Sequence, residues 1–218
     1  MRGDSVVVLD YHKRAAREIV AHLVRKVEKK TARYIITIAG ESGSGKSESG
    51  KAISDELANL GIKSVVLCQD DYFVLPPRSN DLKRREDPDW LGPHVEVKLD
   101  VLDQNLVDAI EGRGEIAKPL VDYDSNTIEE EIINLDEVRV LIAEGTYTSL
   151  LKHADTRIFI SRTRSDTLEH RQKRRRGSEA GDPFIEQVLR IEHMIIAGHK
   201  QLADILISKD FEVTFVDG

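Results

Sequence analysis

The sequence predicts a three-layer α/β fold, in which a mostly parallel sheet carries helices on both faces and a small lid. Three observations lead to this prediction. Apolar runs of strand length alternate with amphipathic helical stretches, a glycine-rich turn separates the first such strand from the next helix, and no linker or repeat interrupts the order. With 218 residues, of which 40% are hydrophobic, the chain can build one sizeable core. We therefore expect residues 1–218 to form a single domain.

The first half of the chain alternates helices and buried strands. Apolar residues recur every three or four positions over residues 10–30, which predicts a helix within an N-terminal extension, residues 1–32. Its apolar face could pack on the domain or on a second subunit. The remaining predictions here are a buried strand at Tyr34–Ala39, a helix at Ser47–Leu60 stopped by Gly61, a strand at Lys63–Gln69 and a loop at Leu75–Pro93.

The second half continues the alternation after a polar excursion. We expect a helix at Val101–Ile110, a hairpin at Ile116–Leu135, buried strands at Val138–Ala143 and Thr156–Ile160, a basic helix at Ser165–Arg176, a helix at Asp182–His199 and β-rich segments at Leu202–Ile207 and Phe211–Val216. Strands that alternate with helices are typical of a parallel sheet.

Composition excludes several classes of protein. The longest apolar runs are of strand length, far below the roughly 18 residues that cross a bilayer, and no secretory signal is visible. A single cysteine, Cys68, excludes a disulfide framework, so we expect a cytoplasmic protein. The net charge of -7 disfavours nucleic-acid binding, although seven basic and two acidic residues cluster between Arg162 and Arg176. Such a local cluster suits a compact polyanion better than a long one.

One motif indicates the chemistry. Residues 40–47, GESGSGKS, match G-x-x-x-x-G-K-[ST] in full and lie between a predicted strand and a predicted helix. Glycines let the backbone N–H groups close around phosphate oxygens, and the helix that follows presents the positive end of its dipole. Lys46 would reach the β- and γ-phosphates and the Ser47 hydroxyl would bind Mg²⁺. The expected nucleotide-binding residues are Gly40, Ser42, Gly43, Ser44, Gly45, Lys46 and Ser47.

Three carboxylates follow predicted strands. Asp70 and Asp71 end the second strand and Glu144 ends the third, and ligands of open α/β sheets bind at the carboxyl ends of the strands. We therefore expect all three to face the γ-phosphate. Asp70 is the candidate base for an acceptor hydroxyl, and Glu144 could hold hydrated Mg²⁺ or the acceptor. The absence of an N-K-x-D motif disfavours a switch GTPase.

Several segments together resemble the uridine kinase and phosphoribulokinase-like branch of P-loop kinases. The glycine-rich motif, Leu67–Phe73, Leu141–Gly145 and Ala203–Ile207 match the family's segments in order and spacing. The resemblance implies ATP and Mg²⁺ as cofactors, makes Asp70 the catalytic base, and gives residues 162–178 as a basic lid. It implies that Arg171 and Arg175 stabilise the transferring charge. Candidate acceptor contacts are Asp70, Tyr72, Asp89, Tyr123, Glu144 and Arg164.

The chain departs from the family where the nucleoside would bind. Uridine kinases carry a His and an Arg shortly after a P-x-Y-D-F segment, and Pro119–Glu130 has neither. Tyr123 and Trp90 could stack on a ring of the acceptor instead. We therefore expect an ATP- and Mg²⁺-dependent kinase that phosphorylates a hydroxyl of a small molecule, of nucleoside or sugar type. The alternative is a nucleotide-binding regulatory module without kinase activity, and a homo-oligomer is left open.

Overall fold

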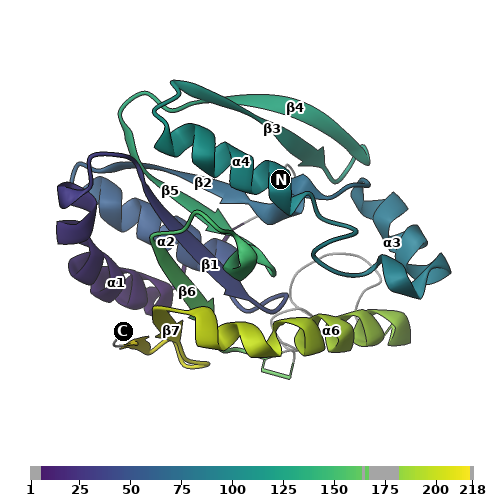
Figure 1. The fold of residues 1–218 in the computed structure, drawn as a ribbon. Coiled ribbons are helices and arrows are strands. Elements are labelled where there is room, and N and C mark those ends of the chain that lie inside the picture. Colours follow the sequence, from purple (N-terminus) through teal and green to yellow (C-terminus); the bar gives the residue numbers. More distant parts are fainter. Residues whose placement is uncertain (1–5, 164, 167–181, 217–218) are drawn as a thin grey trace.

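The fold is a three-layer α/β arrangement, seen in a computed structural model that describes residues 6–163, 165–166 and 182–216 (Figure 1). The described strands of the main sheet follow the order β2-β5-β1-β6-β7-β8, and each neighbouring pair is parallel except β7 with β8. The strands are β1 (Tyr34–Gly40), β2 (Lys63–Cys68), β5 (Val138–Glu144), β6 (Thr156–Ile160), β7 (Ile205–Ile207) and β8 (Val213–Phe215). The predicted α/β class with a mostly parallel sheet is confirmed.

Helices cover both faces of this sheet. One face packs against α1 (Asp10–Lys29) and α2 (Lys46–Asn59), and the other against α4 (Leu99–Ile110) and the end of α6 (Pro183–Ile196). The predicted hairpin is present as β3 (Glu115–Asp122) and β4 (Thr127–Asn134), which form a separate antiparallel sheet. Because β1 is buried on both faces, alternate side chains of one strand enter the two cores.

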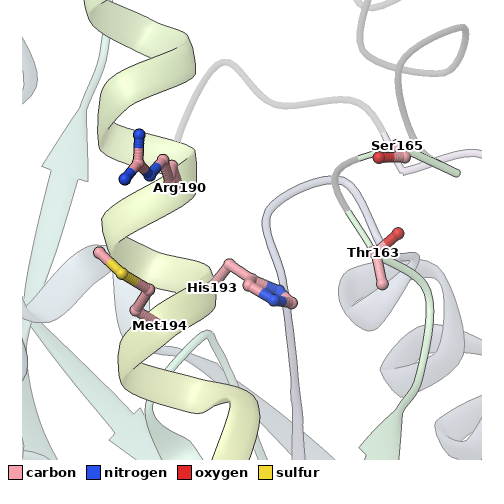
Figure 2. Close-up of a pocket in the computed structure, with 5 residues that line it drawn as sticks. All are labelled: Thr163, Ser165, Arg190, His193 and Met194. Carbon is pink, nitrogen blue, oxygen red and sulfur yellow. The ribbon is translucent and has the colours of Figure 1, made fainter.

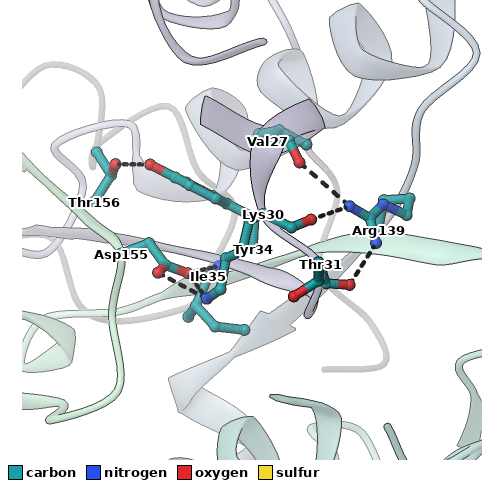
Figure 3. Close-up of polar contacts among 8 residues, drawn as sticks. All are labelled: Val27, Lys30, Thr31, Tyr34, Ile35, Arg139, Asp155 and Thr156. Atoms are coloured by element: carbon teal, nitrogen blue, oxygen red, sulfur yellow. Dashed lines mark hydrogen bonds and ion pairs between the residues drawn. The ribbon is translucent and has the colours of Figure 1, made fainter. Parts of the chain in front are cut away.

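The N-terminal helix packs on the domain itself. Its apolar stripe, which includes Ile19 and Leu23, belongs to the same core as α2 and β1. At its end, Arg139 donates hydrogen bonds to the carbonyl oxygens of Val27, Lys30 and Thr31 (Figure 3). Asp155 accepts hydrogen bonds from the ammonium of Lys30 and the backbone N–H of Ile35. These contacts fix the start of β1.

The Leu75–Pro93 segment corrects a prediction. It was expected to be a loop, but it contains α3 (Pro77–Glu86) and a short 3-10 turn, η2 (Pro88–Trp90). The helix is strongly polar, and two ion pairs join it to its surroundings: Arg84 with Glu96, and Arg85 with Asp182. Arg85 also pairs with Asp81 within the helix. Charge pairs therefore hold in place a helix that its weak apolar pattern did not reveal.

Other elements differ from prediction at their ends. A 3-10 segment, η5 (Ala197–Leu202), follows α6, so β7 is shorter than the predicted strand. Most of the predicted basic helix Ser165–Arg176 and of the lid 162–178 lies outside the described residues. No described helix has the length and apolar character needed to cross a membrane.

Candidate active site

The glycine-rich motif forms the turn between β1 and α2. Gly45 is the N-cap of α2 and has a left-handed φ of 101°, which a side chain would oppose. A Cβ on Gly40, whose φ is 154°, would lie 2.9 Å from the carbonyl oxygen of Ile160. The hydroxyl of Ser44 is fully buried and has no hydrogen-bond partner among the described residues. The turn is therefore compact, begins a helix, and keeps a polar group ready for a ligand.

Lys46 and Ser47 lie at the start of α2 and reach across this turn. The Lys46 ammonium donates a hydrogen bond to the carbonyl oxygen of Glu41 at 3.0 Å. The Ser47 hydroxyl donates to Oε1 of Glu144 at 3.0 Å, joining α2 to the end of β5. This hydrogen bond brings together the two residues that the sequence predicts to bind Mg²⁺.

The electrostatics around Glu144 reflect its burial. Burial raises the pKa of this carboxyl above its ordinary value, the positive charge of Lys46 lowers it, and the charge of Asp70 raises it further. Burial, together with Glu144 and Asp70, also raises the pKa of the Cys68 thiol well above its ordinary value. Since the charges of Lys46 and Asp70 both act on Glu144, the three groups share one small region at the carboxyl ends of the strands.

The hydroxyl of Ser47 and the carboxylate of Glu144 suit Mg²⁺, which prefers oxygen ligands and usually keeps several waters. Mg²⁺ in nucleotide sites typically uses one or two protein oxygens and the phosphates themselves. Among the residues that the structure describes, no group of three or more His, Cys, Asp and Glu side chains could hold a metal ion.

The two neighbouring aspartates after β2 have different roles. Both belong to the 3-10 turn η1 (Gln69–Tyr72). The Asp71 carboxylate is buried, pairs with the Lys118 ammonium at 2.9 Å and accepts a hydrogen bond from the backbone N–H of Val121. Asp70 is only half-buried, and no described residue forms a hydrogen bond or ion pair with it. The expectation that Asp71 faces the phosphate is therefore wrong, because its carboxylate binds the hairpin.

Tyr72 is a second correction. We expected an acceptor contact, but its side chain is completely buried in the core beneath α4. Its hydroxyl donates a hydrogen bond to Oδ1 of Asn105 at 2.8 Å. The 3-10 turn carries Tyr72 away from the strand ends and into the protein.

The other predicted acceptor contacts lie farther out. Tyr123 is half-buried in the turn between β3 and β4, and Asp89 is exposed in η2. The indole N–H of Trp90 donates a hydrogen bond to the side-chain oxygen of Asn80, so the polar atom of this ring is used within the segment itself. The structure thus gathers Lys46, Ser47, Asp70 and Glu144 but does not bring Asp89 or Tyr123 into that group.

Arg164, Arg171 and Arg175 lie outside the described residues.

Sequence reasoning missed the contribution of α6. His193 Nδ1 lies 2.6 Å from Oε1 of Glu41, the second residue of the glycine-rich motif. A cavity of about 430 Å³ adjoins this contact and is lined by Thr163, Ser165, Arg190, His193 and Met194. Figure 2 shows His193 projecting from α6 toward the segment that carries Thr163 and Ser165. The helix α6 therefore lies beside the glycine-rich turn. The only sequence signal for this contact was the three-residue spacing of Arg190 and His193, which places both on one face of a helix.

Comparisons with known proteins agree with this geometry. Over 192 residues the chain is 28% identical to the bifunctional alpha-galactosidase/sucrose kinase of Mediterraneibacter gnavus, a match that covers 83% of this chain and 20% of that protein. Over 184 residues it is 28% identical to the uridine kinase of Bacillus thuringiensis, covering 79% of this chain and 84% of the enzyme. The chain is thus similar in sequence to uridine kinases, in line with the resemblance noted in its motifs.

Structural likeness to a solved structure extends over most of the chain. D-glycerate 3-kinase from Cryptococcus neoformans superposes with a TM-score of 0.63 at 13% identity, covering 95% of this chain and all of that one. At that identity the likeness concerns the fold alone. No protein-family model matches the chain. The chain spans only a fifth of the length of the bifunctional relative.

Proposed function

We propose that this protein is a kinase that uses ATP and Mg²⁺ to phosphorylate a hydroxyl group of a small molecule. The observation that carries the proposal is the difference between the two aspartates after β2. Asp71 is committed to a buried ion pair, whereas Asp70 keeps its carboxylate free beside Lys46 and Glu144. Nucleotide binding alone has no use for that free carboxylate, but phosphoryl transfer does.

The chemistry follows from this arrangement. The backbone N–H groups of the glycine-rich turn and the Lys46 ammonium bind the phosphates of ATP. The carboxylate of Asp70 accepts the proton of the acceptor hydroxyl as the hydroxyl oxygen bonds to the γ-phosphorus. The bond from the γ-phosphorus to the bridging oxygen breaks, and ADP leaves with its electron pair. Ser47 and Glu144 would hold Mg²⁺, which neutralises charge on the phosphates.

The test is acceptor-dependent formation of ADP. Purified protein would receive Mg·ATP with uridine, cytidine, ribulose 5-phosphate, pantothenate, glycerate, sucrose or other sugars. We expect turnover with at least one acceptor and a loss of about 10²-fold or more in kcat for Asp70→Asn, with ATP affinity nearly unchanged. Asp55→Asn is the matched control, because Asp55 makes only an exposed ion pair with Lys51.

Two outcomes would contradict the proposal. Absence of ATP binding would remove the basis for any nucleotide-dependent function. ATP binding without ADP formation from any acceptor would instead support a regulatory nucleotide-binding module. A loss of ATP affinity in Asp70→Asn equal to its loss in rate would count against Asp70 as the base.

A further inference from the structure

A buried polar cluster lies between α3, α6 and the segment after β5. We call Arg84, Glu96, Tyr147 and Glu192 the inner polar cluster. Tyr147 belongs to it because, besides burial, which raises the pKa of its hydroxyl, the charges of the other three residues act on that group. Arg84 Nε donates to Oε2 of Glu96 at 2.7 Å, and Arg84 Nη2 lies 3.9 Å from Oε1 of Glu192. The cluster therefore contains two carboxylates and one guanidinium, all largely removed from solvent.

Glu96 has all the partners that its position requires. Besides Arg84, it accepts hydrogen bonds from the backbone N–H of Gly92 and the side-chain amide of Asn80. It is completely buried. Its role is to hold α3 and the segment after η2 together, so it is not available to a ligand.

Tyr147 and Glu192 are different. The Tyr147 hydroxyl and Oε2 of Glu192 are buried, and neither has a hydrogen-bond partner among the described residues. Tyr147 is 1% exposed and Glu192 6%. A buried polar group left without a partner destabilises the fold. The hydroxyls of Tyr34 and Tyr72, which are also buried, are both paired.

Both unpaired groups belong to segments that also carry residues of the proposed site. Tyr147 follows Glu144 by three residues, and Glu192 precedes His193, which contacts the glycine-rich turn. The positive charge of Lys46 and the negative charge of Asp70 both act on the pKa of Glu192, which burial raises. Glu192 therefore lies within electrostatic range of Lys46, which we assign to phosphate binding, and of Asp70, which we assign to proton transfer.

We propose that Tyr147 and Glu192 form a subsite for a second hydroxyl of the acceptor, which makes the acceptor an uncharged, polyhydroxylated molecule of the sugar class. This inference rests on the proposed kinase function. A hydroxyl group suits the pair because it accepts a hydrogen bond from Tyr147 and donates one to Glu192. The excess of carboxylate over guanidinium disfavours a phosphate group of the acceptor at this position.

The decisive variant is Tyr147→Phe, which removes only the unpaired oxygen. We expect KM for the acceptor to rise at least about tenfold, while KM for ATP stays nearly unchanged. We expect the melting temperature to stay constant or rise, because the variant removes a buried group that has no partner. Glu192→Gln should raise the acceptor KM in the same way.

Tyr34→Phe is the matched control. Its hydroxyl is also buried, but it forms a hydrogen bond with Thr156, where β1 and β6 begin, at the opposite ends of the strands from Glu144 (Figure 3). Loss of that hydrogen bond should lower the melting temperature and leave both KM values unchanged. The contrast separates a hydroxyl kept for a ligand from one kept for the fold.

The acceptor panel would compare sucrose, D-fructose and D-mannitol with uridine, followed by monodeoxy analogues of the best substrate. We expect a sugar or polyol to give the highest kcat/KM, and one monodeoxy analogue to be rejected by wild type but much less by Tyr147→Phe. Wild-type turnover with an unchanged acceptor KM in Tyr147→Phe would overturn this inference alone. So would a loss of stability equal to that of Tyr34→Phe, since it would mean that an internal water already pairs the hydroxyl. Absence of turnover with every acceptor would refute the kinase function itself.

Discussion

The two aspartates after β2 permit a test in which neighbouring substitutions have opposite effects. Asp70→Asn should abolish most of the turnover and leave stability unchanged. Asp71→Asn should destabilise the protein, because it breaks a buried ion pair in which the side chains of Asp71 and Lys118 are each 3% exposed. Removing one partner of a buried pair costs about 3–5 kcal/mol. The neighbouring Glu131, 3.2 Å from Lys118, keeps one negative charge nearby, so we expect a value near the lower limit.

The measurement is urea unfolding of wild type and each variant. With a slope of about 2 kcal/mol per M, a loss of about 3 kcal/mol lowers the midpoint of the Asp71→Asn transition by about 1.5 M. The double variant Asp71→Asn with Lys118→Met should recover part of this loss, since it no longer leaves an ammonium buried beside a neutral amide.

The reasoning fails if the two substitutions behave alike. An unchanged midpoint for Asp71→Asn would mean that the Lys118 ion pair contributes little to the fold. A midpoint for Asp70→Asn lowered as far as that of Asp71→Asn would mean that Asp70 has a structural partner. Loss of turnover in a fully stable Asp71→Asn variant would transfer the proposed catalytic role to Asp71.

Three further predictions concern the phosphate end of the site. Gly45→Ala would place a Cβ 2.9 Å from the Phe211 ring at a φ of 101°, so ATP affinity, measured by titration calorimetry, should fall at least about tenfold. Gly61→Ala is the control: no atom lies within 4 Å of its added Cβ, so ATP affinity should stay unchanged. Burial raises the pKa of Glu144, so the contribution of this carboxyl to stability is full below the ordinary carboxyl pKa and is lost as pH rises through the folded-state pKa. The urea midpoint of Glu144→Gln should therefore be higher than that of wild type at neutral pH but not in acid. Equal midpoints for the two proteins at both pH values would contradict this prediction. Removal of Mg²⁺ with EDTA should weaken ATP binding markedly in wild type and less in Glu144→Gln; equal weakening would argue against Glu144 as a holder of the metal.

Much of the fold could be predicted because burial and backbone geometry leave clear patterns in the sequence. Tyr34–Ala39 and Val138–Ala143 are apolar except for Thr37 and Arg139, and both are interior strands of the sheet with side chains largely buried on two faces. The glycine-rich motif between strand and helix predicted the turn, since its backbone angles require glycine at Gly40 and Gly45.

The errors arose where tertiary contacts override local pattern. Residues of α3 have little apolar periodicity, and the helix depends on ion pairs such as Arg84 with Glu96, twelve residues apart. The direction of the Tyr72 side chain follows from a 3-10 turn that no sequence pattern marks. Glu192 did leave a signal, because it lies on the buried face of α6 with Val188 and Ile196, four positions away on either side. A charged residue within an apolar stripe was therefore the available clue to the inner polar cluster.

The helix α6 contacts both the glycine-rich turn and the inner polar cluster. His193 contacts Glu41 at the glycine-rich turn, and the preceding residue, Glu192, enters the inner polar cluster. Consecutive residues of a helix project about 100° apart, so one rigid helix can reach both places at once. Any displacement of α6 would move the phosphate-side contact and the acceptor-side contact together. The position of this helix thus fixes the proposed acceptor subsite relative to the glycine-rich turn. In-line phosphoryl transfer requires the two bound substrates to be held in such a fixed relative position.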